Sequence, residues 1–295
     1  MRKANWTRRK FIAKSAGSAA ALPFIKAPFS LPENLPPAAC LLIHEQEEGP
    51  YYVDREILRK DITEGKPGVP LLLRLTLFDV KTCQPLENAA LDIWHCDALG
   101  TYSGYTAFQP GPGGPGGPGG PSGPGRMPPP SPGSDPGPGG PPMGGPPKRH
   151  PTDKQIFLRG VQLTDAKGLV EFSTIYPGCY QGRTNHIHLK VHIGGHAEGS
   201  DYKGGHVAHT GQIFFPEDIT KGVVSLKPYA DHKIARVTLD EDGVFTSQQG
   251  SQTIATLAPR TPGNPTAGYI ATLSIAVDRD ATPAPTRMAG PPRRS

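Results

Sequence analysis

The sequence lacks the long, regular apolar patterns that are typical of helical and membrane proteins. No long segment repeats its apolar residues with a period of 3.6, because Pro and Gly, with 36 and 37 residues, interrupt most candidate helices. The apolar stretch over residues 15–22 is too short, and too rich in Ala, Gly and Ser, to span a bilayer. These absences argue against a helical bundle and against a membrane-spanning helix near the N-terminus.

Acidic residues are missing from the first thirty positions. This stretch contains seven Lys or Arg, whereas the whole chain has a formal net charge of +5. The remaining residues therefore sum to a charge of −2. The basic isoelectric point belongs mainly to the N-terminal segment, and it gives no footprint for nucleic acid. We accordingly predict no nucleic-acid partner.

The basic N-terminal segment has the features of a twin-arginine export signal. Arg8 and Arg9 are followed by Phe11 and then by the small, mildly apolar stretch 15–22. The alternative is an ordinary basic, disordered N-terminus. The pattern predicts a signal and linker over residues 1–38 and a bacterial protein that is periplasmic or secreted, with no membrane contact after export.

Cysteine is scarce, with four residues in the chain. Export would permit disulfides, and Cys83 and Cys96 flank a turn between two strand-like runs. We therefore expect these two residues to pair across a hairpin, the alternative being buried free thiols. The spacing around Cys179 fits no cysteine-based zinc pattern.

Short strand signals dominate the rest of the sequence. Runs bounded by Gly, Pro, Asp or Asn predict strands at Leu71–Val80, Ala90–Cys96, Ile156–Leu163, Leu169–Thr174, His186–Ile193, Gln212–Phe215, Ala235–Leu239 and Tyr269–Val277. Such spacing with few helices predicts an all-β protein, an antiparallel β-sandwich with long loops over residues 39–280. Residues 281–295 are expected to be a disordered tail.

One segment of this domain has a different composition. Residues 110–150 consist mostly of Gly and Pro and contain few apolar residues to bury. We predict a disordered surface insert, which a sandwich can carry because loop-closure entropy grows slowly with length. A tether for a partner or a flap over a site is the alternative.

The segment His186-Ile-His188 alternates like a β-strand. Apolar residues occupy the odd positions as far as Ile193, and polar residues occupy the even ones. Both imidazoles would therefore lie on one face, about 7 Å apart along the backbone. Such a pair is half of a transition-metal site. Taken alone, however, it is equally consistent with a strand that exposes its polar face.

Four segments together form a more specific pattern. The segments are Glu48-Gly-Pro-Tyr-Tyr52, Leu91–Tyr105 with its Gly-Thr-Tyr-Ser sequence, Thr174–His188 with Pro-Gly-Cys-Tyr, and Gly211–Pro216. From about Glu48 to Pro216 the chain resembles the intradiol ring-cleavage dioxygenases, the group that contains catechol and protocatechuate enzymes. The resemblance implies cleavage of a catechol-type ring between its two hydroxylated carbons by O2, giving a cis,cis-muconate-type diacid.

The resemblance also implies one non-haem Fe(III) ion per chain and no other cofactor. The ligands that it implies are Tyr102, Tyr180, His186 and His188. Phenolate is a hard anionic donor that favours ferric iron, and two phenolates would balance two of its three positive charges. A trivalent ion at bonding distance would also remove the phenol protons.

Further roles are implied for residues around these ligands. Tyr180 would leave the metal and act as a base, and Arg183 would stabilise charge on the attacked ring. Gln212 matches a family glutamine near the position of O2 or of the anhydride. Tyr105 is expected to line the pocket and Tyr176 to pack at its turn. The remaining histidines of this region are expected to be polar surface residues or to support the ligands, namely His95, His192, His206 and His209.

Other interpretations remain open at this point. The sandwich could be a non-catalytic binding module that retains the fold, or a zinc or copper hydrolase or oxidase that uses the histidines. Only five residues separate Tyr180 from His186, a shorter connection than the better-known enzymes carry. The pocket walls therefore differ, and the sequence leaves the aromatic substrate and the oligomeric state open.

Overall fold

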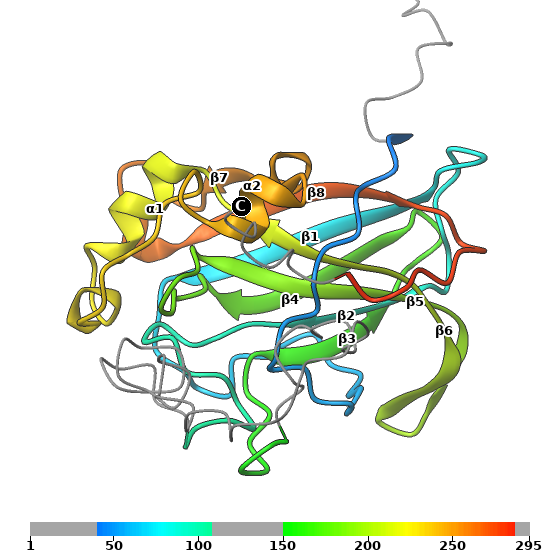
Figure 1. Cartoon of the computed structure of the whole chain (residues 1–295), viewed down its shortest axis with the longest axis horizontal. Coiled ribbons are helices and arrows are strands. Elements are labelled where there is room, and N and C mark those ends of the chain that lie inside the picture. The colour runs from blue at the N-terminus through cyan, green and yellow to red at the C-terminus, as the bar shows by residue number, and fades with distance from the viewer. Residues whose placement is uncertain (1–39, 108–149, 287–295) are drawn as a thin grey trace, which may run out of the picture. The chain divides into compact units, whose positions relative to one another are not determined.

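Two four-stranded sheets form a β-sandwich in the computed structural model, which describes residues 40–107 and 150–286 (Figure 1). One sheet has the order β4-β1-β8-β7 and the other has the order β3-β2-β5-β6. The strands are β1 Pro70–Asp79, β2 Ala90–Trp94, β3 Arg159–Leu163, β4 Leu169–Ile175, β5 His186–Glu198, β6 Asp201–Phe214, β7 Thr256–Pro259 and β8 Tyr269–Val277. The predicted all-β sandwich is thus confirmed, although β1 and β8 pair in parallel.

Helices are short and connect strands. Within the described residues they are α1 Glu217–Val224, η2 Tyr229–Asp231, α2 Gly243–Ser247, η3 Gly250–Thr253 and η4 Pro265–Ala267. None of the helices in the described part of the chain has the length and apolarity needed to cross a membrane. The predicted export signal, nearly all of the Gly/Pro-rich insert and the last residues of the predicted tail lie outside the described residues.

The inner faces of the two sheets form the apolar core. In β1, Leu71, Leu73, Leu75 and Leu77 are buried and alternate with partly exposed residues, as the period-2 pattern requires. Facing residues of the second sheet complete the same cluster. Each fully buried leucine contributes about 1.5–3 kcal/mol of burial free energy, so this cluster stabilises the scaffold on which the loops are mounted.

The first half of strand β5, His186–His192, is buried on both of its faces. Ile187, Leu189 and Val191 point into the core, as the alternation predicted. The even-numbered residues of this half lie on the opposite face and are also buried, because loops and the segment from residue 44 to 58 cover it. The polar face of this part of the strand therefore also lies inside the protein, away from solvent.

Several strand boundaries differ from those expected from sequence. The predicted strand Ala235–Leu239 is wrong, because this segment has no strand partner and is held instead by an Arg236–Glu217 ion pair. The His- and Gly-rich stretch 194–210 forms the outer part of the β5–β6 hairpin, and β7 was not predicted. Local β-propensity does not predict either outcome, because a segment forms a strand only where the edge of a neighbouring strand is available for pairing.

The predicted Cys83–Cys96 disulfide is wrong. Cys83 pairs with Cys40, whereas Cys96 and Cys179 are buried free thiols. The two strand-like runs are β1 and β2, which belong to different sheets and form no hairpin. Their ends therefore separate instead of meeting across a turn.

Candidate metal centre and active site

Two tyrosines and two histidines from three parts of the chain converge at one end of β5. His186 and His188 begin this strand, Tyr102 lies in the turn region after β2, and Tyr180 lies in the loop between β4 and β5. The ring centroids of Tyr102 and Tyr180 are 5.7 Å apart, and those of Tyr180 and His186 are 5.6 Å apart. The His188 ring lies 4.7 Å from that of His186 and 6.1 Å from that of Tyr102. The structure thus brings together the four side chains singled out as ligands.

The two imidazoles direct the same ring atom toward each other. Their Nε2 atoms are 3.1 Å apart. Nδ1 of His186 lies 2.7 Å from the Thr184 carbonyl oxygen and donates to it, which leaves Nε2 with a free lone pair. Burial lowers the pKa of His186 to about 3 and that of His188 well below its usual value. Both rings are therefore neutral at pH 7, the form in which imidazole binds a metal.

The ring of His188 is held by an aromatic neighbour. The Trp94 indole stacks on it with 4.9 Å between centroids and an interplanar angle of 4°. Trp94 lies opposite His188 in the β2–β5 register, so both side chains occupy the same face of the sheet. This contact fixes the orientation of the imidazole plane.

The two phenol groups differ in their surroundings: Tyr102 is buried, whereas Tyr180 is only partly buried. The Tyr102 hydroxyl is fully enclosed, with no hydrogen-bond partner, which is rare for a buried polar atom. Burial raises the pKa of Tyr102 and that of Tyr180, so an uncharged pocket would keep both protonated. A cation beside them reverses this preference. Two hard oxygen donors and two neutral nitrogens therefore fit a trivalent metal ion, which the Tyr102 hydroxyl would bind.

An aromatic wall stands beside these donors. Tyr51 stacks on Tyr102 at 4.6 Å between centroids and meets Tyr180 edge-on at 5.8 Å. The hydroxyl of Tyr105, expected to line the pocket, donates to the Tyr52 carbonyl. Tyr51 belongs to the Glu48–Tyr52 motif, but no local pattern assigns it a contact with Tyr102 or Tyr180.

Arg183 and Gln212 are joined directly. A guanidinium Nη of Arg183 donates to Gln212 Oε1 over 2.5 Å, and Gln212 Nε2 donates to the Glu47 carbonyl over 2.9 Å. Gln212 faces His188 in the β5–β6 register, which places its side chain on the face that carries the histidines. The Arg183 amide also donates to the carbonyl of Tyr180, so a tight turn positions the cation next to that ligand.

Asp242 anchors the arginine, and the sequence analysis missed it. Its Oδ2 accepts from Arg183 Nε at 2.9 Å and from the Thr184 amide at 2.8 Å, and its Oδ1 caps the N-terminus of α2. The carboxylate is fully buried. Burial acts to raise its pKa, but the Arg183 charge and the backbone amides that donate to it act together to lower it. The N-cap pattern of Asp before a short helix was the available sequence signal, but nothing local connects it with Arg183.

Other predicted residues lie outside the four-donor cluster. Tyr176 hydrogen-bonds Thr220 in the core, as its packing role implied. His95, His192 and His209 are buried, so they are not surface residues. His95 is held between the Cys96 carbonyl and the Thr174 hydroxyl, each at 2.8 Å.

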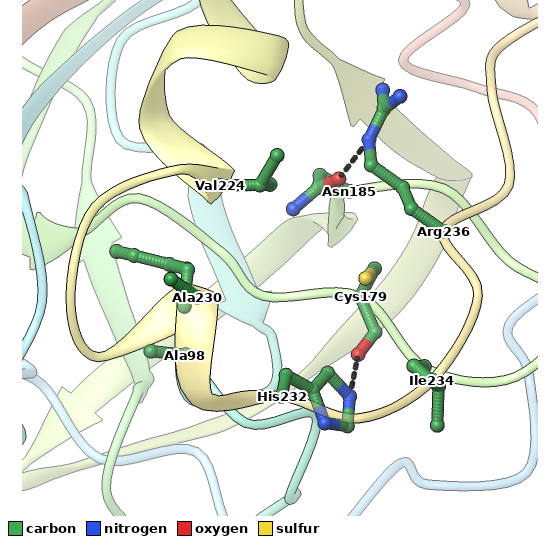
Figure 2. Close-up of a pocket in the computed structure, with 9 residues that line it drawn as sticks. Ala98, Cys179, Asn185, Val224, Ala230, His232, Ile234 and Arg236 are labelled. Atoms are coloured by element: carbon green, nitrogen blue, oxygen red, sulfur yellow. Dashed lines mark hydrogen bonds between the residues drawn. The ribbon is translucent and has the colours of Figure 1, made fainter.

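A cavity of about 310 Å³ lies behind the loop that carries Tyr180 (Figure 2). Cys179 and Asn185, the residues immediately before Tyr180 and His186, line it together with His232 and Arg236. His232 contacts the Cys179 carbonyl at 3.0 Å, and Arg236 donates to Asn185 at 3.4 Å. Cys179 thus faces a separate space and does not join the four donors.

Comparison with solved structures shows similarity over most of the chain. An intradiol ring-cleavage dioxygenase from Tetranychus urticae is 30% identical, with a TM-score of 0.63, and the match covers 83% of this chain and 98% of that protein. A second dioxygenase structure is 31% identical with the same TM-score of 0.63, and the match covers 83% and 97% of the two chains. No family model matches the sequence, and neither does any curated protein.

Proposed function

The chain belongs to the intradiol ring-cleavage dioxygenases, and we propose that it cleaves a catechol-type aromatic ring with O2 between the two hydroxylated carbons. Tyr102, Tyr180, His186 and His188 would hold a single non-haem Fe(III) ion. The observation that carries this proposal is the convergence of these four donors around a buried Tyr102 hydroxyl that has no protein partner. When bound, the ferric ion would supply the Lewis acidity that activates a chelating catecholate toward O2.

The two tyrosines have different environments. Tyr102 is 2% exposed and wedged between Tyr51 and Tyr180, whereas the Tyr180 residue is partly exposed. Tyr180 also lies in a loop, whereas the histidines lie on a strand held from both sides. Tyr180 is therefore the side chain that can turn away and accept a catechol proton at its phenolate oxygen, while Tyr102 stays in place.

Arg183 supplies the fixed positive charge next to the reacting ring. Its guanidinium is 7% exposed and held by Asp242 and Gln212, so it needs no reorganisation when negative charge develops on the substrate. The wall formed by Tyr51 limits access of water to the donors on one side. A preorganised cation in such surroundings stabilises a transition state by a few kcal/mol.

The direct test is oxygen consumption by purified, iron-loaded protein with a panel of catechols, together with identification of the products. We expect ring-opened diacids from cleavage between the hydroxylated carbons. Tyr102→Phe should abolish turnover, whereas the control Tyr269→Phe, on β8 of the other sheet, should leave it unchanged. Products of cleavage beside the hydroxylated carbons, or full activity of Tyr102→Phe, would refute the assignment.

The same experiment separates the alternative functions. A non-catalytic module would bind aromatic ligands without consuming oxygen. A zinc or copper enzyme would retain activity after iron is replaced by those metals. Neither alternative explains why two phenols accompany the histidine pair, since zinc and copper sites in proteins favour nitrogen and sulfur donors.

A further inference from the structure

A second polar cluster lies on the same face of β2 and β5. It consists of Glu56, Asp92 and His192, each of which places one donor atom within 4.8 Å of the others. His192 follows His188 by four residues on β5, which corresponds to about 13 Å along the strand. The cluster is therefore separate from the four-donor centre.

His192 lacks a hydrogen-bond partner that its burial would require. The residue is 5% exposed, and its Nε2 is buried without a partner. Nδ1 lies 3.6 Å from Glu56 Oε1, beyond hydrogen-bonding distance. Burial lowers the pKa of His192 to about 4, so the ring is neutral at pH 7 and retains a lone pair that can bind a cation.

The two carboxylates also lack a cation at ion-pair distance, although the Tyr52 hydroxyl donates to Glu56 Oε1 at 3.4 Å and the Lys190 charge acts on both acids. Among the described residues, neither Asp92 nor Glu56 forms an ion pair with a Lys or Arg. The nearby Lys190 ammonium is 2.6 Å from Glu48 and sits 3.4 Å from the centroid of the Tyr52 ring. Burial raises the pKa of Asp92 to about 7 and also raises that of Glu56. Two acids placed together in this way favour a bound cation or the uptake of a proton.

The guanidinium whose charge acts on Asp92, that of Arg159, is already engaged in hydrogen bonds. Arg159 donates from Nε to the Ser103 hydroxyl at 2.8 Å and from Nη2 to the Tyr51 carbonyl at 2.8 Å. Arg159 therefore acts on Asp92 through its charge without forming an ion pair with it. Within the described residues, no lysine or arginine forms an ion pair with any of the three donors of the cluster.

We propose that Glu56, Asp92 and His192 form a second metal site, which binds a divalent first-row cation such as Zn²⁺. A mixed set of carboxylate oxygen and imidazole nitrogen favours such an ion over Ca²⁺ or Mg²⁺, which prefer oxygen ligands throughout. Zinc–ligand bonds are about 2.0–2.2 Å long. A donor set spread over at most 4.8 Å therefore closes around the ion with small side-chain movements.

A metal bound at this site would hold the segment that contains Glu56 against the sheet. Glu56 lies in a segment whose backbone accepts from the Tyr202 amide at 2.8 Å. A few residues earlier the same segment contains Tyr51 and Tyr52, which pack on Tyr102 and Trp94. A metal that joins Glu56 to Asp92 and His192 would tie the aromatic wall of the proposed active site to the strands beneath it.

The experiment is a calorimetric titration of the iron-loaded, full-length protein with Zn²⁺, accompanied by metal analysis after dialysis. We expect one zinc per chain in addition to iron. His192→Gln and Asp92→Asn should each weaken zinc binding by more than about a hundredfold, with unchanged far-ultraviolet circular dichroism. The control is His206→Gln, a more exposed histidine on the neighbouring strand β6, which should bind zinc like the wild type.

Zinc could also enter the four-donor centre, and Tyr102→Phe separates the two sites. If the proposed site exists, Tyr102→Phe should still bind zinc, whether or not it binds iron. Adding His192→Gln to that variant should weaken this zinc binding. The proposal is overturned if the wild type binds no zinc beyond the four-donor centre, or if His192→Gln leaves zinc affinity unchanged. Failure of the iron assignment alone would leave this test intact.

Discussion

The two faces of the first half of β5 are almost equally buried and have different roles. Ile187 and Leu189 are 0% exposed in the sandwich core, and His186 and His188 are 1% and 0% exposed on the opposite face. The apolar face contributes burial free energy that is insensitive to geometry at the level of single atoms. The polar face contributes atoms whose partners must be placed within a few tenths of an ångström. Burial alone therefore does not reveal which face carries the chemistry, whereas an orphaned polar atom does.

The largest effect is expected from removing a donor on the polar face. His188→Gln should lower turnover by at least about a thousandfold, because losing Lewis-acid activation worth several kcal/mol has that consequence. Thermal stability should change little, since the proposal gives this side chain a role in catalysis. Turnover assays and thermal melts of the same preparation measure both quantities. A variant that keeps more than a tenth of wild-type activity would contradict the ligand assignment.

The adjacent residue on the other face should behave in the opposite way. Leu189→Ala removes a fully buried side chain from the core and should lower the free energy of unfolding by about 2–5 kcal/mol. Iron content and activity per folded molecule should remain near those of the wild type. Urea unfolding gives the first quantity, and metal analysis gives the second. Loss of iron without loss of stability would show that the two faces are not independent.

A smaller effect is expected at the carboxylate behind the arginine. Asp242→Asn keeps the size of the side chain but removes the charge that orients Arg183, and kcat should fall by about 10–100-fold, in the range typical of residues that orient an active group. KM should change less, because the substrate keeps its contacts with the metal. Asp240→Asn, at an exposed position two residues earlier, is the control. Equal loss in both variants would indicate a general effect on this loop.

The smallest effect at neutral pH is expected at His95. Burial lowers its pKa from 6.5 to about 4 in the folded protein, so the unfolded chain binds more protons between these values. Stability linked to this residue is therefore present above pH 6.5 and is lost as pH falls toward 4, with a slope of up to about 1.4 kcal/mol per pH unit.

His95→Gln should remove this part of the pH dependence. Urea unfolding between pH 4.5 and 7.5 should show the wild-type and variant curves converging or crossing as the pH falls. Curves that stay parallel over the whole range would mean that His95 does not titrate differently in the folded and unfolded states.

Much of the fold could be predicted because it depends on local pattern. The alternation of β5 and the run of leucines in β1 each specified a strand and its inward face, since side-chain period and burial are properties of contiguous residues. Errors arose where the outcome depends on distant partners. The Cys40–Cys83 pairing required knowing that β1 and β2 lie in different sheets.

The same distinction applies to the site. Tyr102, Tyr180 and the histidine pair stood out through motifs, and the structure brings them together. Asp242 and the wall formed by Tyr51 could not be predicted, because each acts on residues more than fifty positions away in the chain. Contacts between residues so far apart in the chain produce no periodic pattern in the sequence.

The visible absorption spectrum of purified protein reconstituted with ferric iron tests the central claim most directly. The account predicts one iron per chain and a burgundy colour from charge transfer between tyrosinate and Fe(III), which disappears in Tyr102→Phe. A colourless protein that nevertheless contains stoichiometric iron would show that the tyrosines are not ligands and would contradict the proposed metal centre.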